Sequence, residues 1–230
     1  KNSKQAPLNE EQKINASGFS ALNAEVRYLN PVLHVTFPRD TNGVKWANRF
    51  TSVNKKREGV LTTTKIHPDS PVDPKKKANE EYTSEIDWTK VLFAAGPLLI
   101  PSVTVSKANL SREQIIAEKT RLRSLFASLA NAETPAVAAE EGEMYSITFT
   151  QESAVYEGAY CWADDRIYGV IYSPEDHFAL VQQLRDRGEN GVTTIVVPSF
   201  VKPENIHVYS LAITADGKIT SNSVHMTLGA

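Results

Sequence analysis

The chain of 230 residues contains almost no sulfur, with one cysteine, Cys161, and two methionines. A single cysteine excludes an intramolecular disulfide framework, but it does not fix the compartment, because proteins without disulfides also function outside the cell. The sequence also lacks any run of about 18 apolar residues, so we expect no membrane-spanning helix. Its longest apolar stretch, Val91 to Ile100, is interrupted by Gly96 and Pro97.

Net charge is nearly absent as well. The formal value of -2 gives no general attraction to nucleic acid or to an acidic membrane surface. Two basic runs, residues 55–57 and 75–77, lie close to Glu and Asp. We interpret them as solvated loop charge, with a binding patch as the alternative. Nucleic acid is therefore not an expected partner.

The sequence shows no signal peptide, and it begins at Lys1. A targeting segment upstream of Lys1 would have been removed from a processed product. The localisation is therefore unknown from the sequence, with the cell surface, the extracellular space or a virion slightly favoured.

Catalytic motifs are missing too. The chain has no Gly-x-Ser-x-Gly turn, no phosphate-binding glycine-rich loop, no His-Glu-x-x-His and no Cys-x-x-Cys. Cys161 has no adjacent basic residue to lower its pKa, so we expect a buried packing residue rather than a nucleophile. We predict no catalytic residue, no cofactor and no metal ligand. A hydrolase with an unrecognised site stays open, because catalytic groups are assembled in space rather than in sequence.

Two acidic groups could offer oxygen ligands to calcium: Asp164 with Asp165, and Asp186 with Glu189 and Asn190. Neither group has the spacing of the helix-loop-helix calcium motif. Aspartate and asparagine also favour turns for local reasons, so we prefer the turn interpretation.

Two of the five histidines, His207 and His225, fall on the two strands of the predicted final hairpin. They could face each other across it, which would allow a two-histidine metal or pH-sensing site. Our preferred interpretation is that both side chains point to solvent on the polar face of the sheet.

A helix is predicted from about Glu10 to Leu29. Asn9 and Gln12 have the spacing of a capping box, and Asn30-Pro31 should end the helix, because proline cannot donate the next backbone bond. One apolar stripe is expected to be buried, comprising Ile14, Phe19, Leu22, Val26 and Leu29.

The following region is less regular. A weak helix carrying Val44, Trp46 and Phe50 is expected first. Residues 55–85 are polar and contain three prolines, which predicts a long surface loop. Residues 86–99 are apolar and are expected to enter a sheet.

The rest of the sequence is typical of short strands. One helix, at about residues 111–131, interrupts them, with Ser111 and Gln114 as its capping box. Asp216-Gly217 supplies the turn of the last hairpin. The predicted strands are Ser102–Lys107, Tyr145–Thr150, Arg166–Ser173, Phe178–Leu184, Gly191–Val197, Ile206–Thr214 and Lys218–Leu228.

This pattern predicts an α+β, mainly β protein. Residues 1–100 form an N-terminal helical segment with a long polar loop and a connecting strand. Residues 101–230 form an immunoglobulin- or fibronectin type III-like antiparallel β-sandwich with the inserted helix. No Cys–Trp–Cys signature supports a true immunoglobulin domain.

Three stretches carry a family resemblance: residues 8–12 leading into the first helix, residues 87–91 with Gly96 and Leu98, and residues 207–224. The third contains His-Val-Tyr, Ala-Asp-Gly-Lys and Ser-Asn-Ser-Val. Together they resemble the uncharacterised bacterial family known as domain of unknown function 6266. The resemblance implies a helical N-terminal part and a C-terminal β-sandwich, with the helix near residues 111–131 as an insertion. It implies no activity.

Aromatic residues crowd one region and are the candidate binding residues: Tyr156, Tyr160, Trp162, Tyr168 and Tyr172. Such clusters anchor protein partners or stack on sugar rings, although strand aromatics also fill sandwich cores. We expect a non-enzymatic structural or assembly protein, such as a subunit of a surface layer, filament or virus-like particle, with itself or another protein as partner. The alternatives are a glycan- or peptide-binding module and, third, the hydrolase.

Overall fold

A computed structural model describes residues 8–37, 45–73, 75–111, 113–117, 120–121 and 144–228. Its first element is the helix α1 (Glu10–Thr36), which begins at the predicted capping box. The Asn9 side chain accepts from the backbone N–H of Gln12 at 2.8 Å, and the Gln12 side chain accepts from the N–H of Asn9 at 3.0 Å. Local sequence therefore fixes where the helix starts.

The predicted end of this helix is wrong, because α1 continues through Pro31 to Thr36. Pro31 is exposed, whereas the next residues, Val32 and Leu33, are fully buried. Burying two large aliphatic side chains stabilises the last turn by about 3 kcal/mol or more. That gain offsets the backbone hydrogen bond that proline cannot donate.

The predicted long polar loop is also wrong. After α2 (Trp46–Lys55) the chain forms an antiparallel hairpin of β1 (Leu61–Lys65) and β2 (Tyr82–Ile86), with a short helix α3 (Ala78–Glu81) before β2. Both strands are rich in threonine or serine and alternate between exposed and less exposed positions. Threonine suits a half-buried strand, but the polar composition concealed the period-two pattern.

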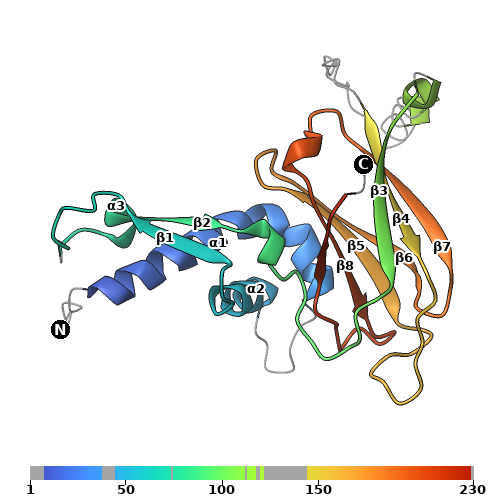
Figure 1. Cartoon of the computed structure of the whole chain (residues 1–230), viewed down its shortest axis with the longest axis horizontal. Coiled ribbons are helices and arrows are strands. Elements are labelled where there is room, and N and C mark those ends of the chain that lie inside the picture. The colour runs from blue at the N-terminus through green and yellow to red at the C-terminus, as the bar shows by residue number, and fades with distance from the viewer. Residues whose placement is uncertain are drawn as a thin grey trace, which may run out of the picture.

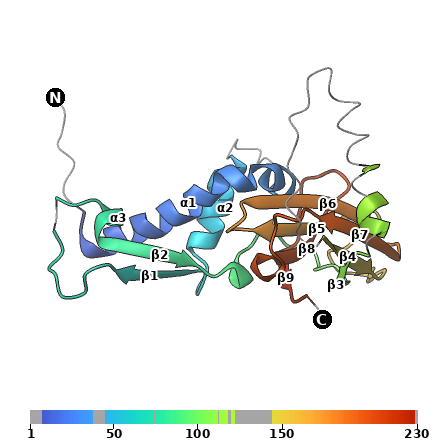
Figure 2. The ribbon, with the colours of Figure 1, turned by 90° about the horizontal axis from the view of Figure 1, so that it is seen from above.

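The hairpin packs on the N-terminal half of α1 over Lys13, Ser17 and Gly18, which are buried. The predicted apolar stripe is confirmed only in part, because Leu22 and Leu29 are fully buried in the core, whereas Ile14 and Phe19 are 38% and 48% exposed. Figures 1 and 2 show this half of α1 projecting from the rest of the molecule, with the hairpin beside it. We call the N-terminal half of α1 together with β1, α3 and β2 the arm.

Residues 86–99 do not form the predicted strand, since only Ile86 is in a strand, as the last residue of β2. A short 3-10 helix, η1 (Trp88–Lys90), follows β2, and the only bridge described for residues 87–99 joins Leu98 to Ser221. Phe93 and Ala94 are fully buried. This segment is apolar because it lies inside the core between the helices and a sheet, so its hydrophobicity gave a misleading signal for a strand.

All seven strands predicted for the sandwich are confirmed, and the last is shorter than expected. They pair as two antiparallel sheets with the orders β3-β4-β7 and β6-β5-β8-β9. Gly217 has φ 74°, as the predicted Asp-Gly turn requires. The strands are β3 (Val103–Asn109), β4 (Tyr145–Gln151), β5 (Arg166–Ser173), β6 (Phe178–Asp186), β7 (Gly191–Val197), β8 (His207–Ile213) and β9 (Val224–Met226).

The four-stranded sheet is covered on both faces. Along β5, Ile167 and Ile171 pack against the other sheet, while Val170 and Tyr172 pack in the cluster that contains α1, α2 and Phe93. The protein therefore has three layers, helices on sheet on sheet (Figure 1). The fold is α+β and mainly β, as predicted. Its immunoglobulin or fibronectin type III character stays a prediction, as does the division at residue 100.

The inserted helix begins as predicted. Ser111 N–H donates to the Gln114 side chain at 2.8 Å, and Gln114 N–H donates to the Ser111 hydroxyl at 3.3 Å. Residues 113–117, 120 and 121 are helical. The rest of the predicted helix, to residue 131, lies outside the described residues, and so does Val44. A second 3-10 turn, η2 (Pro203–Asn205), precedes β8.

Candidate functional site

The five candidate aromatic residues separate into two groups. Tyr156, Tyr160 and Trp162 lie in the loop between β4 and β5 and are 59%, 61% and 45% exposed. Tyr172 is fully buried in the core under the helices, and Tyr168 packs partly buried against the same core. The predicted binding site was therefore too large, because the tyrosine side chains of β5 point toward the helical layer. Only the three loop residues remain available to a partner.

We call residues 152–165 the aromatic loop; it lies at the lower end of the sandwich in Figure 1. The rings of Tyr160 and Trp162 are nearly perpendicular, at 88°, with centroids 6.1 Å apart. The backbone N–H of Leu99 donates to the carbonyl of Tyr160 at 2.9 Å. Leu99 and Ile100 are 38% and 46% exposed, so apolar surface continues onto the adjoining segment.

A buried ion pair fixes this loop to the rest of the sandwich. Arg187 Nε donates to Asp165 Oδ2 at 2.9 Å, and Arg187 Nη2 donates to the carbonyl of Leu99 at 2.7 Å. Both charged side chains are only 1% exposed. One guanidinium therefore joins three segments, namely the aromatic loop, the segment before β3 and the turn after β6.

Sequence reasoning missed Arg187. It lies in the run Asp-Arg-Gly-Glu-Asn, which is typical of an exposed charged turn. Its partner Asp165 is 22 residues away, so nothing in the local pattern indicates the pair. The sequence offers only a weak signal for this role, namely one arginine among the turn residues that follow a strand.

Cys161 is 5% exposed, which confirms the predicted buried packing role. Its Sγ accepts a hydrogen bond from the backbone N–H of Tyr156 at 3.2 Å and donates to the carbonyl of the same residue at 3.5 Å. The thiol therefore closes the aromatic loop on itself. The exposed rings are mounted on a backbone that is held at both Cys161 and Asp165.

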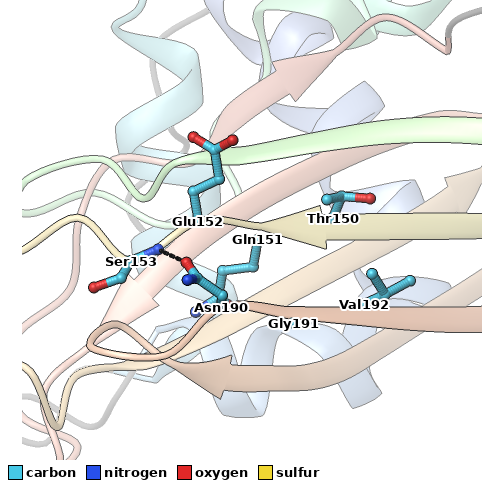
Figure 3. Close-up of a pocket in the computed structure, with 7 residues that line it drawn as sticks. All are labelled: Thr150, Gln151, Glu152, Ser153, Asn190, Gly191 and Val192. Atoms are coloured by element: carbon cyan, nitrogen blue, oxygen red, sulfur yellow. Dashed lines mark hydrogen bonds between the residues drawn. The ribbon is translucent and has the colours of Figure 1, made fainter.

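A shallow hollow of about 630 Å³ opens at the start of the aromatic loop (Figure 3). Asn190 Oδ1 accepts from the backbone N–H of Ser153 at 2.7 Å across it. The seven lining residues include one carboxylate, Glu152, but no histidine, lysine or cysteine; they are Thr150, Gln151, Glu152, Ser153, Asn190, Gly191 and Val192. This lining can bind through hydroxyl and amide groups.

The acidic groups behave as turn residues, in agreement with the preferred interpretation. Asp165 is paired with Arg187, and the N–H of Glu189 donates to the carbonyl of Asp186 at 2.9 Å. Across the described part of the chain, no three or more His, Cys, Asp or Glu side chains cluster where they could hold a metal.

His207 and His225 do face each other, with His207 Nδ1 3.3 Å from His225 Nε2. The expectation that both point to solvent is wrong, because both are partly buried. Burial, with a smaller effect of the neighbouring His225, lowers the pKa of His207 to about 4. Burial also lowers the pKa of His225, while the charge of Asp87 opposes both shifts.

No protein-family model matches the chain, and neither does any curated protein or solved structure. The resemblance to the uncharacterised bacterial family therefore stays a prediction. Among the described helices, none is both long enough and apolar enough to cross a membrane.

Proposed function

We propose that the protein is a non-enzymatic structural or assembly protein, a subunit of a surface layer, filament or virus-like particle, that binds copies of itself or another protein. The observation that carries this proposal is the aromatic loop. Three large rings are about half exposed there, while the backbone that bears them is fixed by buried contacts of Asp165 and Cys161.

Such a surface suits a protein interface for two physical reasons. Tyrosine and tryptophan contribute most of the energy of many interfaces, and covering the exposed half of each ring would gain about 1 kcal/mol or more. A backbone that is already ordered loses little entropy on association. The adjoining exposed Leu99 and Ile100 would enlarge the covered area.

A sheet edge provides a second contact that fits assembly. Among the described strands, β7 pairs only with β4, and its sequence, Gly-Val-Thr-Thr-Ile-Val-Val, has no charged residue. The other edges of the sandwich are different, since β3 contains Lys107, β6 contains Arg185 and Asp186, and β9 has only three residues. Charge on an edge opposes strand pairing between molecules, so β7 is the edge least protected against it.

Sedimentation velocity over a wide concentration range tests the assembly proposal. We expect the wild-type protein to associate, and the double variant Tyr160→Ser/Trp162→Ser to associate about 10-fold more weakly. Ile66→Ser is the control, because Ile66 is similarly exposed, at 43%, but lies directly after β1, far along the chain from the aromatic loop. A wild-type protein that stays monomeric at high concentration, or a double variant that associates like the control, contradicts the proposal.

A glycan- or peptide-binding module is the second candidate, and the perpendicular pair Tyr160 and Trp162 favours it. Ring faces stack on apolar faces of ligands, and the neighbouring hollow offers hydroxyl and amide groups. Trp162 is the most exposed of the three tryptophans, since Trp88 is buried and Trp46 is partly buried. A glycan array followed by fluorescence titration tests this candidate. Binding should shift the emission of the wild-type protein and not that of Trp162→Phe, and an array without hits would exclude the glycan.

A further inference from the structure

Two histidines lie on one face of neighbouring strands with their ring nitrogens close together. In the β8–β9 register Tyr209 is opposite His225, so His207, two residues from Tyr209, is on the same face. His207 Nδ1 and His225 Nε2 are 3.3 Å apart. Two positions on hydrogen-bonded strands are fixed relative to each other, so the pair is organised before any ligand binds.

The separation of these nitrogens matches the bite of a tetrahedral metal ion. Zinc binds histidine nitrogen at about 2.0–2.1 Å, and at the tetrahedral angle two such nitrogens are about 3.3–3.4 Å apart. The measured 3.3 Å therefore allows both rings to bind one ion after small rotations. The ring that carries the hydrogen between them would hold it on its other nitrogen instead, so that both facing nitrogens could bind the ion.

The surroundings hold the rings in place, and one nearby carboxylate partly offsets the effect of burial on positive charge. The Tyr209 ring packs edge-on against His225 with centroids 5.2 Å apart, and the Trp88 ring lies 6.5 Å from that of His207. Asp87, next to Trp88, is the carboxylate whose charge acts on both histidines. Its own oxygens are held by Thr89 and Lys90. Aromatic walls and a fixed nearby carboxylate are features that orient histidine ligands and stabilise a cation.

We propose that His207 and His225 chelate one divalent transition-metal ion of the zinc, nickel or copper class, with water completing its coordination. Imidazole nitrogen suits these ions, whereas calcium and magnesium require oxygen ligands. The proposal rests on the β8–β9 geometry and the residues beside it, and it is independent of the proposed function. A metal bound there would link the edge strand β9 to β8.

Titration calorimetry of the full chain, freed of metal by a chelator, tests the site. We expect one zinc or nickel ion per chain at micromolar affinity, and no binding of calcium. His225→Gln and His207→Gln should each weaken binding about 10-fold or more. His67→Gln is the control, because His67 is exposed in the turn after β1 and should leave the affinity unchanged. Binding that is absent, or equal in all four proteins, would overturn the proposal.

A second measurement on the wild-type protein keeps the test valid if a glutamine variant does not fold. Zinc should shift the imidazole NMR signals of two histidines and leave those of the other three unchanged. Signals that shift for all five, or for none, would show that this pair is not the site.

Discussion

Arg187 and Asp165 form an ion pair in which both side chains are 1% exposed and Nε lies 2.9 Å from Oδ2. One oxygen of Asp165 and one nitrogen of Arg187, Oδ1 and Nη1, are buried without a partner among the described residues. Two charges in this environment stabilise each other only while both are present. The pair is therefore the charged contact among those that position the aromatic loop, beside the hydrogen bonds of Cys161 and Tyr160.

Arg187→Met should destabilise the protein by about 3–5 kcal/mol, because Asp165 would be left buried without its counter-charge. Urea unfolding followed by circular dichroism measures this. Arg185→Met is the control, since Arg185 is exposed two residues away, and it should change the free energy of unfolding by less than about 0.5 kcal/mol. Equal midpoints for the two variants would show that the ion pair does not hold the loop.

Acid should loosen the arm through Glu81. The Lys13 ammonium, which forms a buried ion pair with this carboxylate, and the backbone N–H of Asp73 hold the pKa of Glu81 below its ordinary value of 4.5. The folded state therefore binds this proton more weakly than the unfolded state. The resulting stability is present in full above pH 4.5, and it is lost as pH falls below 4.5 and through the lowered pKa.

Hydrogen exchange of the β1 and β2 amides between pH 7 and pH 3, corrected for intrinsic exchange rates, measures this loss. Protection of the hairpin should fall with acid in the wild-type protein and in Glu80→Gln, whose residue is exposed. Glu81→Gln should already have low protection at pH 7 and change little. Parallel pH profiles for all three proteins would contradict the assignment to Glu81.

Gly169→Ala should destabilise the sandwich by about 1–3 kcal/mol, the usual effect of overpacking. A Cβ atom at Gly169 would lie 2.7 Å from the ring of Phe149 on the facing sheet. Adding Phe149→Leu should recover part of the loss, giving a coupling of about 0.5 kcal/mol or more in a double-mutant cycle. Strictly additive effects would mean that the ring is not what excludes the methyl group.

Pro31→Ala should stabilise the protein by about 1 kcal/mol. The new N–H can donate to the carbonyl four residues earlier, and this gain exceeds the loss of the stiff proline in the unfolded chain. Pro31 is exposed, so no packing is lost. Thermal unfolding should shift upward by about 2–4 °C, and a lower melting temperature would mean that the turn needs the proline.

Local signals were sufficient for some elements and misleading for others. The capping box of Asn9 and the Asp216-Gly217 turn act within a few residues, so they are visible in the sequence. The continuation of α1 past Pro31 depends on burial of Val32 and Leu33, which is decided by tertiary packing. The β1–β2 hairpin depends on polar contacts with α1, for example Ser17 with Ser84 at 2.9 Å.

The candidate site shows the same division. Sequence identified the region of the aromatic loop, but it could not separate Tyr160 from Tyr172. The alternation of side chains along β5 predicts that the strand has two faces, one of which is normally exposed to solvent. Here helices cover the second face, so Tyr172 is buried, whereas Tyr160 in the loop is 61% exposed.

Because the β6-β5-β8-β9 sheet is hydrophobic on both sides, we expect the sandwich not to fold stably without the helices. A fragment starting at residue 101 would expose Tyr209 and Leu211, which are both 0% exposed in the whole chain, as part of a hydrophobic sheet surface. Such a fragment should aggregate rather than fold. The helical layer is therefore part of the structural core, and through Leu22, Leu61 and Ile86 the arm contributes to the same cluster.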